Sequence, residues 1–247
     1  MTSWPRGYAL KTFDVIDSTN EEAKRLAMAG EAGPIWISAA RQTAGRGRRG
    51  RVWESPTGNL AATLMLRPVR PASECAQISF SAALAASDML TAFAGDTQLR
   101  LKWPNDVLAG GAKIAGILLE SASQGTGAPT WLAIGIGVNL TTHPEGMEFP
   151  ATSLKALGAN APSAEDALLH LAAAFAKWYE IWTAEGFAAI RDAWLARAAG
   201  LGGRIRARLA TGEKVGVFEG LDETGALLLR EDGGALRAIA AGEVFFA

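Results

Sequence analysis

The hydrophobic and polar positions of the first 140 residues follow the periods of strands and helices in turn. Short apolar stretches between turn-forming residues predict strands at 11–17, 34–40, 60–66, 99–101, 107–108, 114–120 and 131–140. The pair Gly110-Gly111 predicts a hairpin turn between the fifth and sixth of these strands. Helical segments separate some of the strands, so the pattern favours a mixed or antiparallel sheet backed by helices.

Two helices are expected among these strands. Ser18 and Glu21 have the S-x-x-E spacing of a capping box, which predicts a short helix that Gly30 ends. A longer helix is expected over 74–93 because its apolar residues recur near helical spacing. They are Ile78, Ala82, Ala85, Met89 and Phe93.

The pattern changes twice in the last third of the chain. Ser163 is expected to cap a helix with a single apolar stripe, and a second helix is expected over 187–198. The stripe consists of Leu168, Leu171, Phe175, Trp178 and Trp182. After residue 200 the sequence RIRARL alternates strictly, and turn signals at 211–212, 222–225 and 232–234 separate further short strands.

The expected fold is therefore α+β, in two domains. Residues 1–200 are predicted to form the sheet and its helices, and residues 201–247 a small SH3-like β-barrel. Hydrophobic residues make up 49% of the chain and eight are tryptophans, which is enough apolar material for a buried core.

Composition and targeting signals indicate a cytoplasmic protein. Cys75 is the only cysteine, so an internal disulfide framework is excluded, and its alanine-rich surroundings favour a small buried residue. The N-terminal residues lack the apolar segment of a signal peptide. No apolar run approaches the roughly 20 residues that cross a bilayer, so no membrane association is expected.

The most unusual segment is the run RQTAGRGRRGR at 41–51, which holds five arginines, three glycines and no acidic residue. The whole chain has a formal net charge of −1, so this cationic run stands on an acidic remainder. Arginine forks suit phosphate and carboxylate groups, and glycines let the backbone approach a ligand closely. The run indicates a flexible anion clamp, with a solvated basic loop that touches nucleic acid as the alternative.

Nucleotide-binding motifs do not account for this run. Its GRGRRG matches G-x-G-x-x-G literally, but the RVWESP that follows is no helix start, and Arg70 stands where a Rossmann fold needs an acid. No P-loop, C-x-x-C, H-E-x-x-H or G-x-S-x-G occurs. His143 and His170 form no metal or nucleophile constellation and are interpreted as surface or helix-face residues.

Two further segments carry chemistry. The sequence KWPND at 102–106 brings a lysine, an aromatic ring and a carboxylate together. Its Asn105 and Asp106 could hold a metal-bound water, orient a lysine or cap a turn. Lys113 opens an apolar strand, where its ammonium either reaches solvent or faces an anion. Gly116, Gly135 and Gly137 indicate a close approach by a ligand, or else bulges or packing accommodations.

Five segments in this order together resemble the biotin protein ligases. They are residues 17–20 (DSTN), 42–51 (QTAGRGRRGR), 102–106 (KWPND), 113–120 (KIAGILLE) and 135–139 (GIGVN). The module after residue 200 is similar to the family's C-terminal domain, so the resemblance covers nearly the whole chain. It implies the class II aminoacyl-tRNA synthetase-like catalytic fold that biotin and lipoate ligases share. Bifunctional members carry an N-terminal DNA-binding domain, for which the first 16 residues leave no room, so a ligase without DNA binding is expected.

The resemblance implies a two-step reaction. Biotin and ATP would give biotinyl-5′-AMP and pyrophosphate, and a lysine of a biotin carboxyl carrier domain would then form the amide and release AMP. Mg²⁺ is expected to arrive with ATP, and no protein metal ligand can be assigned directly. An apolar strand edge beside the site could serve the acceptor or a second subunit, so a homodimer is possible.

The site residues follow from the motifs, by resemblance. Expected to bind biotin are Ser18, Thr19, Asn20, Gln42, Gly45, Arg46, Arg48, Lys113, Gly116 and Gly135. Expected on the nucleotide side are Arg46, Arg48, Arg49, Arg51, Trp53, Asn59, Lys102, Asn105 and Asn139. Lys113, Arg48 and Asp106 are the expected catalytic residues, and Asp106 is assigned to orient or deprotonate the incoming lysine. The cationic run should be mobile when empty and close over the adenylate.

Three rivals are weighed against this interpretation. A lipoate ligase would carry an R-R-x-x-G-G-G-type segment with a following His-Asp, and the chain has neither. A nucleic-acid module fits poorly with the acidic remainder of the chain and with the few aromatics beside the basic run. An inactive biotin-binding regulator is disfavoured because Lys113 and the arginines are all present.

Overall fold

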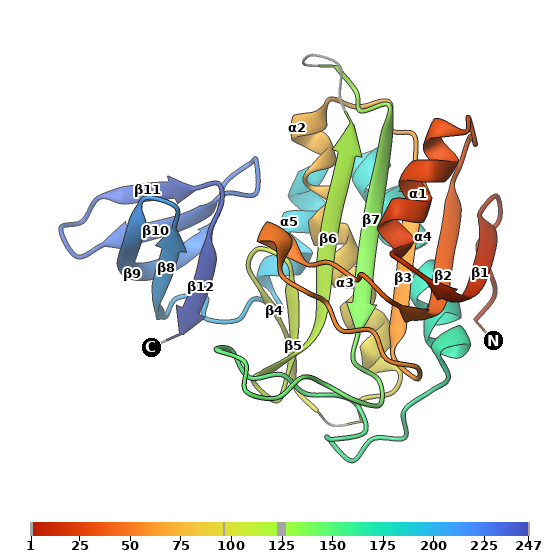
Figure 1. Ribbon diagram of the computed structural model, residues 1–247. Coiled ribbons are helices and arrows are strands. Elements are labelled where there is room, and N and C mark those ends of the chain that lie inside the picture. Colours follow the sequence, from red (N-terminus) through yellow and green to blue (C-terminus); the bar gives the residue numbers. More distant parts are fainter. Residues whose placement is uncertain (1, 96, 123–126, 247) are drawn as a thin grey trace.

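A seven-stranded mixed sheet forms the larger part of the protein. The computed structural model describes residues 2–95, 97–122 and 127–246. Figure 1 shows the sheet, whose strand order is β1-β2-β3-β7-β6-β5-β4. Its strands are β1 (Ala9–Ile16), β2 (Ile35–Gln42), β3 (Leu60–Leu66), β4 (Leu99–Lys102), β5 (Asp106–Ala109), β6 (Ala112–Ala122) and β7 (Trp131–Val138). Strand β1 pairs with β2 in parallel and all other pairs are antiparallel, so the mixed sheet is confirmed.

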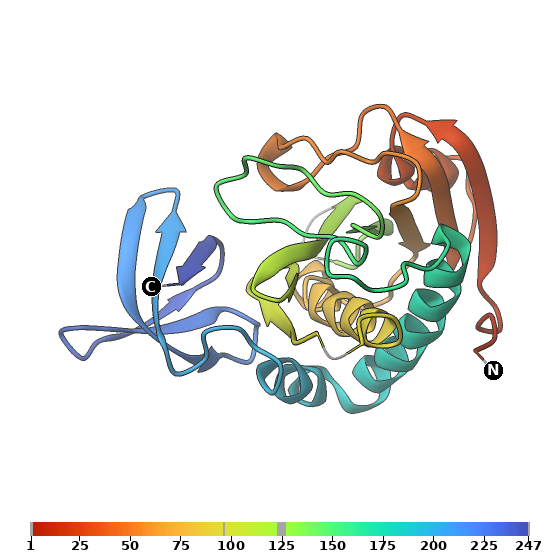
Figure 2. The same ribbon diagram turned by 90° about the horizontal axis from the view of Figure 1, so that it is seen from below.

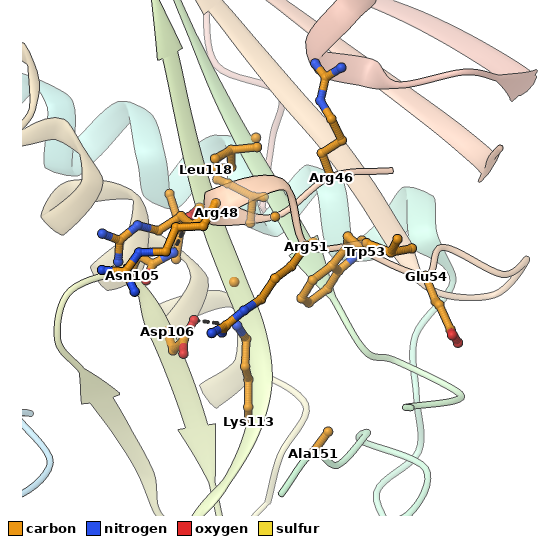
Figure 3. Close-up of a pocket in the computed structure, with 18 of the residues that line it drawn as sticks. Arg46, Arg48, Arg51, Trp53, Glu54, Asn105, Asp106, Lys113, Leu118 and Ala151 are labelled. Carbon is orange, nitrogen blue, oxygen red and sulfur yellow. Dashed lines mark hydrogen bonds and ion pairs between the residues drawn. The ribbon is translucent and has the colours of Figure 1, made fainter. Parts of the chain in front are cut away.

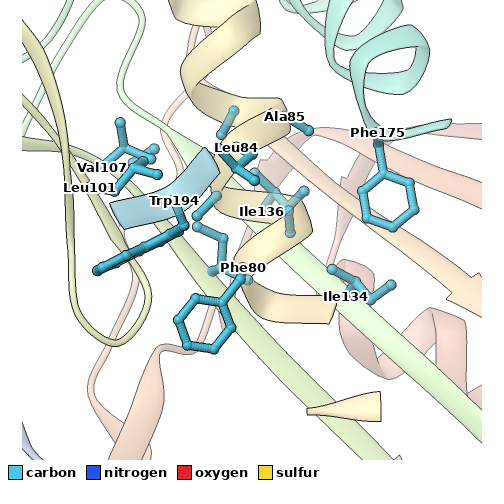
Figure 4. Close-up of a cluster of buried hydrophobic side chains, with 14 of the residues drawn as sticks. Phe80, Leu84, Ala85, Leu101, Val107, Ile134, Ile136, Phe175 and Trp194 are labelled. Carbon is cyan, nitrogen blue, oxygen red and sulfur yellow. The ribbon is translucent and has the colours of Figure 1, made fainter. Parts of the chain in front are cut away.

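Helices cover both faces of this sheet unequally. The helices α3 (Ile78–Thr91), α4 (Ala164–Glu185) and α5 (Phe187–Leu195) lie behind it in Figure 1, and α1 (Thr19–Met28) lies in front. Figure 2 shows α3 and α4 side by side below the sheet. The main core fills the space between these helices and the sheet. It includes Trp36, together with Leu84, Ile134, Phe175 and Trp194, which Figure 4 labels. The apolar stripe predicted on α4 is fully buried.

The boundaries differ from expectation in three places. Ser18 makes no side-chain cap on α1. The reciprocal contact from Glu21 to the Ser18 N–H is absent as well, because Asp17 Oδ1 accepts this N–H at 2.7 Å and Glu21 pairs with Arg46. The helix expected over 74–93 is broken into α2 (Ala72–Cys75) and α3. Tight turns with i→i+3 hydrogen bonds, such as Gln77 N to Glu74 O at 3.0 Å, separate the two. Helix α5 ends at Leu195, three residues before the expected end.

The C-terminal residues form a separate five-stranded antiparallel sheet that curves into a small barrel-like module (Figures 1 and 2). Its strands are β8 (Arg204–Leu209), β9 (Gly212–Leu221), β10 (Leu227–Glu231), β11 (Leu236–Ile239) and β12 (Glu243–Phe246), in the order β11-β10-β9-β8-β12. The alternation of RIRARL is confirmed, because Ile205 and Ala207 are buried while their neighbours are more exposed.

Two contacts hold this module next to the end of β4. The N–H of Leu101 donates to the Arg197 carbonyl at 2.8 Å, and Ala199 N–H returns a bond to the Leu101 carbonyl at 2.8 Å. The buried Trp103 indole donates to the carbonyl of Gly225 at 3.1 Å. The barrel is therefore fixed beside the KWPND turn. In the described part of the chain, no helix is both long enough and apolar enough to cross a membrane.

Candidate active site

A cavity of about 360 Å³ lies on the face of the sheet opposite α3 and α4. Its walls come from parts of the chain that are far apart: the start of α1, the arginine-rich loop, β6 and β7, the segment 144–151 and the barrel strand β12. Sixteen predicted residues line it, namely Ser18, Thr19, Asn20, Gln42, Arg46, Arg48, Arg49, Arg51, Trp53, Lys102, Asn105, Asp106, Lys113, Gly116, Gly135 and Asn139. The fold thus brings together most of the expected site.

Lys113 and Asp106 form the charged pair on the cavity floor (Figure 3). The Lys113 Nζ lies 2.6 Å from Asp106 Oδ1, as an ion pair without good hydrogen-bond geometry. The two meet because β5 and β6 are joined by the Gly110-Gly111 hairpin, which puts Lys113 opposite Leu108 and Asp106 opposite Gly116. Of the alternatives open for Asp106, the geometry favours orientation of a lysine.

Lys102 is a second, deeply buried cation in the same site. Its side chain is 7% exposed, and Nζ lies 4.0 Å from Asp106 Oδ2 and 3.6 Å from the centre of the Phe149 ring. Burial lowers the pKa of the Lys102 ammonium, and the Asp106 carboxylate opposes this shift. A buried cation that faces a cavity is costly without an anion to bind, which favours a negatively charged ligand here.

The arginine-rich loop forms a compact turn at the mouth of the cavity. Residues Arg48–Gly50 make one 3₁₀ turn, in which the Arg51 N–H donates to the Arg48 carbonyl at 3.3 Å, and the Gly47 N–H donates to the Arg51 carbonyl at 2.7 Å. Arg49 has a φ of 57°, which is unusual for a residue other than glycine. The backbone therefore turns back sharply, so the four arginines 46, 48, 49 and 51 all line the cavity. The expectation that the loop is mobile without a ligand stays a prediction.

Three arginines of the loop, Arg46, Arg48 and Arg51, contact different partners. The half-buried Arg48 donates to Asn105 Oδ1 at 3.3 Å and to the Gly242 carbonyl at 3.4 Å. Burial lowers the pKa of the Arg48 guanidinium. Arg51 donates to Glu243 Oε2 of the barrel at 2.8 Å. Arg46 points away from this group in Figure 3 and pairs with acidic residues of α1 and β6.

The glycines of β6 and β7 make room for side chains of the protein itself. A Cβ on Gly137 would lie 2.3 Å from the Trp53 ring, and one on Gly135 would lie 2.3 Å from Asn20 Oδ1. A Cβ on Gly116 would meet the Trp53 ring and Lys113 at 3.2 Å. These distances support the packing alternative, and the close approach of a ligand to these glycines stays a prediction. The glycines seat Trp53 and Asn20 against the sheet.

Two predicted residues lie outside the cavity lining. Gly45 serves the position of Trp53, because its carbonyl accepts the Trp53 N–H at 3.0 Å and a Cβ would lie 2.4 Å from the Trp53 carbonyl oxygen. Asn59 is buried, and its Oδ1 accepts the N–H groups of residues 140, 141 and 142 at 3.1, 3.0 and 3.2 Å. Its amide also donates to the Thr142 carbonyl at 2.9 Å. The Asn59 side chain thus holds the turn after β7 in this structure, and its assignment to the nucleotide stays a prediction.

The Asn59→Ala substitution is expected to lower the free energy of unfolding by about 2–3 kcal/mol, since it leaves buried N–H groups unpaired. Thermal unfolding measures this, with the exposed Asn160→Ala as a matched control that should leave the melting temperature unchanged. A raised KM for ATP without any loss of stability would contradict the structural role.

Sequence reasoning missed the residues that close the cavity from the far side. They are Pro144, Met147, Glu148, Phe149 and Ala151 on one segment, and Glu243, Val244 and Phe245 on β12. Nothing in the local sequence pattern of the barrel marks the positions on β12 as part of a site. Only Phe149 could have been found from the sequence, because it is one of few aromatic residues in a polar segment. Within the described ranges, no three His, Cys, Asp or Glu residues are grouped as a metal site.

Comparisons with known proteins agree with the geometry. Residues 12–139 match the biotin/lipoate A/B protein ligase family, and residues 200–247 match the biotin protein ligase C-terminal domain. The chain is 50% identical over 93% of its length to a biotin–[acetyl-CoA-carboxylase] ligase of Paracoccus denitrificans, covering 97% of that protein. It is 35% identical over 92% of its length to the bifunctional ligase/repressor BirA of Bacillus subtilis, covering 71% of that protein.

Solved structures give the same result for the fold. The biotin protein ligase of Aquifex aeolicus in complex with biotin and ATP superimposes with a TM-score of 0.81 at 27% identity. The match covers 97% of this chain and 98% of that one. Both the sheet with its helices and the C-terminal module therefore have counterparts in that enzyme.

Proposed function

Since the chain belongs to the biotin/lipoate A/B protein ligase family, we propose that it is a biotin–[acetyl-CoA-carboxylase] ligase. The carboxylate of biotin attacks the α-phosphorus of ATP, which gives biotinyl-5′-AMP and releases pyrophosphate. The amine of an acceptor lysine then attacks the acyl carbon, so an amide forms and AMP leaves. The single observation that carries this assignment is the cavity in which Lys113, Arg48 and Lys102 converge on one face of the sheet.

The cations suit the first step because both substrates are anionic. Lys113 and Arg48 neutralise the repulsion between the biotin carboxylate and the phosphates and stabilise the charge that develops at the α-phosphorus. Lys102 and the remaining loop arginines bind the rest of the triphosphate. The polar group Ser18, Thr19, Asn20 and Gln42 at the opposite end offers donors and acceptors for the ureido ring of biotin.

Among the residues that the structure describes, no three His, Cys, Asp or Glu side chains are grouped as a metal site. Asp106, the acidic residue on the cavity floor, is already paired with Lys113 at 2.6 Å. Mg²⁺ would arrive with ATP, and the chemistry that it would supply is neutralisation of phosphate charge. In the second step Asp106 orients the amine of the acceptor lysine, which must be neutral to attack.

The acceptor is a lysine of a biotin carboxyl carrier domain, and the reaction runs in the cytoplasm. The lone buried cysteine fits a reducing compartment. The strand β1 is an edge of the sheet, and this edge can receive the acceptor or a second copy of the chain.

Pyrophosphate release tests this function directly. We expect release that depends on biotin and ATP, with lipoate and octanoate giving no turnover above background. A carrier domain with its acceptor lysine should gain the mass of biotin, and the same domain with that lysine replaced by arginine should not. Turnover with lipoate and none with biotin would end this assignment.

A further inference from the structure

A chain of polar side chains runs behind the wall of the cavity, and the reaction described above does not use its inner members. It begins at Thr63 in the middle of β3, and all the remaining residues of this strand are apolar. Thr63 is 0% exposed and does not line the cavity. A valine has nearly the same shape and would avoid burying a hydroxyl, so the threonine requires an explanation.

The Thr63 hydroxyl fixes two residues that do line the cavity. Its oxygen lies 2.6 Å from Asn20 Oδ1 and 2.7 Å from Thr19 Oγ1. Thr19 in turn contacts Gln42 Oε1, through its hydroxyl at 3.0 Å and through its backbone N–H at 2.8 Å. These contacts join residues of α1, β2 and β3 at the polar end of the cavity.

The hydrogen bonds have a definite direction. The Asn20 amide nitrogen donates to Glu120 Oε2 at 2.7 Å, so Asn20 Oδ1 must be the acceptor toward Thr63. The Thr63 hydroxyl has a single hydrogen, which it donates to Asn20 Oδ1. The Thr19 hydroxyl is then left to donate to Thr63 or Gln42. The carboxylate of Glu120 therefore sets the orientation of the whole series.

Glu120 also reaches the arginine-rich loop. Its other oxygen lies 3.5 Å from the Arg46 guanidinium, which also pairs with Glu21 of α1. Both acidic side chains raise the pKa of Arg46, with the Glu21 hydrogen bond the larger cause. Gly135 is what allows this arrangement, because a Cβ there would lie 2.3 Å from Asn20 Oδ1. Arg46 is thereby tied to the same network as Thr19 and Asn20.

We propose that Thr63 and Glu120 are positioning residues that couple the polar end of the cavity to Arg46 and so to the arginine-rich loop. Neither lines the cavity, so both act through Thr19, Asn20 and Arg46, which do. Binding of the biotin ring at Thr19 and Asn20 then determines how firmly Glu120 holds Arg46. This inference rests on the proposed function, because biotin is the ligand that it requires.

Thr63→Val and Glu120→Gln test the two ends of the network. Each should raise the KM for biotin about tenfold, the effect of losing one well-formed or charge-assisted hydrogen bond, and leave the KM for ATP within twofold of the wild type. Thr63→Ser keeps the hydroxyl and should restore the KM for biotin. Glu31→Gln removes an exposed carboxylate that pairs with Lys11 at 2.9 Å, far from the cavity, and should change neither constant.

A double-mutant cycle separates coupling from independent damage. In an Arg46→Gln background, Glu120→Gln should raise the KM for biotin less than twofold further. Hydrogen exchange gives a second readout: biotin alone should protect residues 43–52 in the wild type and not in Glu120→Gln. Additive effects in the cycle, or a fall in melting temperature with an unchanged KM for biotin, would overturn the coupling. Absence of biotin turnover in the wild type would instead overturn the proposed function.

Discussion

Replacing Lys113 with alanine is expected to lower the rate of biotinyl-AMP formation by about a thousandfold. The ammonium is the cation on the cavity floor, 2.6 Å from Asp106 and 5.5 Å from the centre of the Trp53 ring. Its loss removes a positive charge that would face two anionic substrates, and it leaves Asp106 with only the longer 4.0 Å contact to Lys102. A thousandfold change corresponds to about 4 kcal/mol of transition-state free energy, which is within the range for one preorganised charged donor.

The measurement is single-turnover pyrophosphate release at saturating biotin and ATP. Lys155→Ala, which removes an exposed lysine, is the matched control and should keep the wild-type rate. Lys113→Arg is expected to recover little activity, because a planar guanidinium does not replace a compact ammonium. Asp106→Asn in the Lys113→Ala background should partly restore the rate, because it removes the negative charge that Lys113 no longer neutralises. A rate for Lys113→Ala within tenfold of the wild type would contradict the catalytic assignment.

Replacing Arg48 with alanine is expected to lower adenylate formation about a hundredfold and to make the enzyme release its intermediate. Arg48 is the half-buried arginine that joins the loop to Asn105 and to the Gly242 carbonyl before β12. The substitution removes a cation from the cavity and also removes the contacts of the loop with Asn105 and with the Gly242 carbonyl, so the loop is held less firmly. An open loop no longer protects the acyl-adenylate from water.

Two measurements distinguish these effects. Pyrophosphate release gives the rate of the first step, and the fraction of biotinyl-AMP that is lost to solution per biotin transferred gives the leak. Arg70→Ala is the control, because this arginine pairs with Glu74 on α2 and does not line the cavity. An equal loss of the pyrophosphate-release rate in Arg48→Ala and Arg70→Ala would contradict the assignment of Arg48 to the site. A slow first step without any leak would limit its role to charge.

Much of the fold follows from local pattern. The strands and helices were predicted close to their observed bounds, because the core-facing positions recur with the periods of each element. The broken helix at 76–77 was not predicted, since Ala76 and Gln77 carry no breaker and both have right-handed helical backbone angles. The capping box failed for a related reason. Asp17 accepts the Ser18 N–H and Arg46 pairs with Glu21, and the S-x-x-E spacing gives no sign of either contact.

The candidate site was predicted in part. Its cations and polar groups belong to short motifs, so the chemistry was visible in the sequence, and sixteen of the predicted residues line one cavity. The sequence did not show that Asn59 holds the turn after β7, because an asparagine that supports a turn and one that binds a nucleotide look alike in sequence. The closing residues 144–151 and 243–245 were missed because their position depends on how the barrel docks.

The sequence alone determined which residue types are available and on which strand, helix or loop each stands. It thereby determined the anion-binding character of the loop and the hairpin that joins the strands of Asp106 and Lys113. Only the tertiary structure decided which groups meet across long separations: Arg51 with Glu243, Trp103 with Gly225, and Asn20 with both Thr63 and Glu120. The physical reason is that hydrophobic period specifies the buried face of an element. The partner on that face is selected by packing of the whole chain.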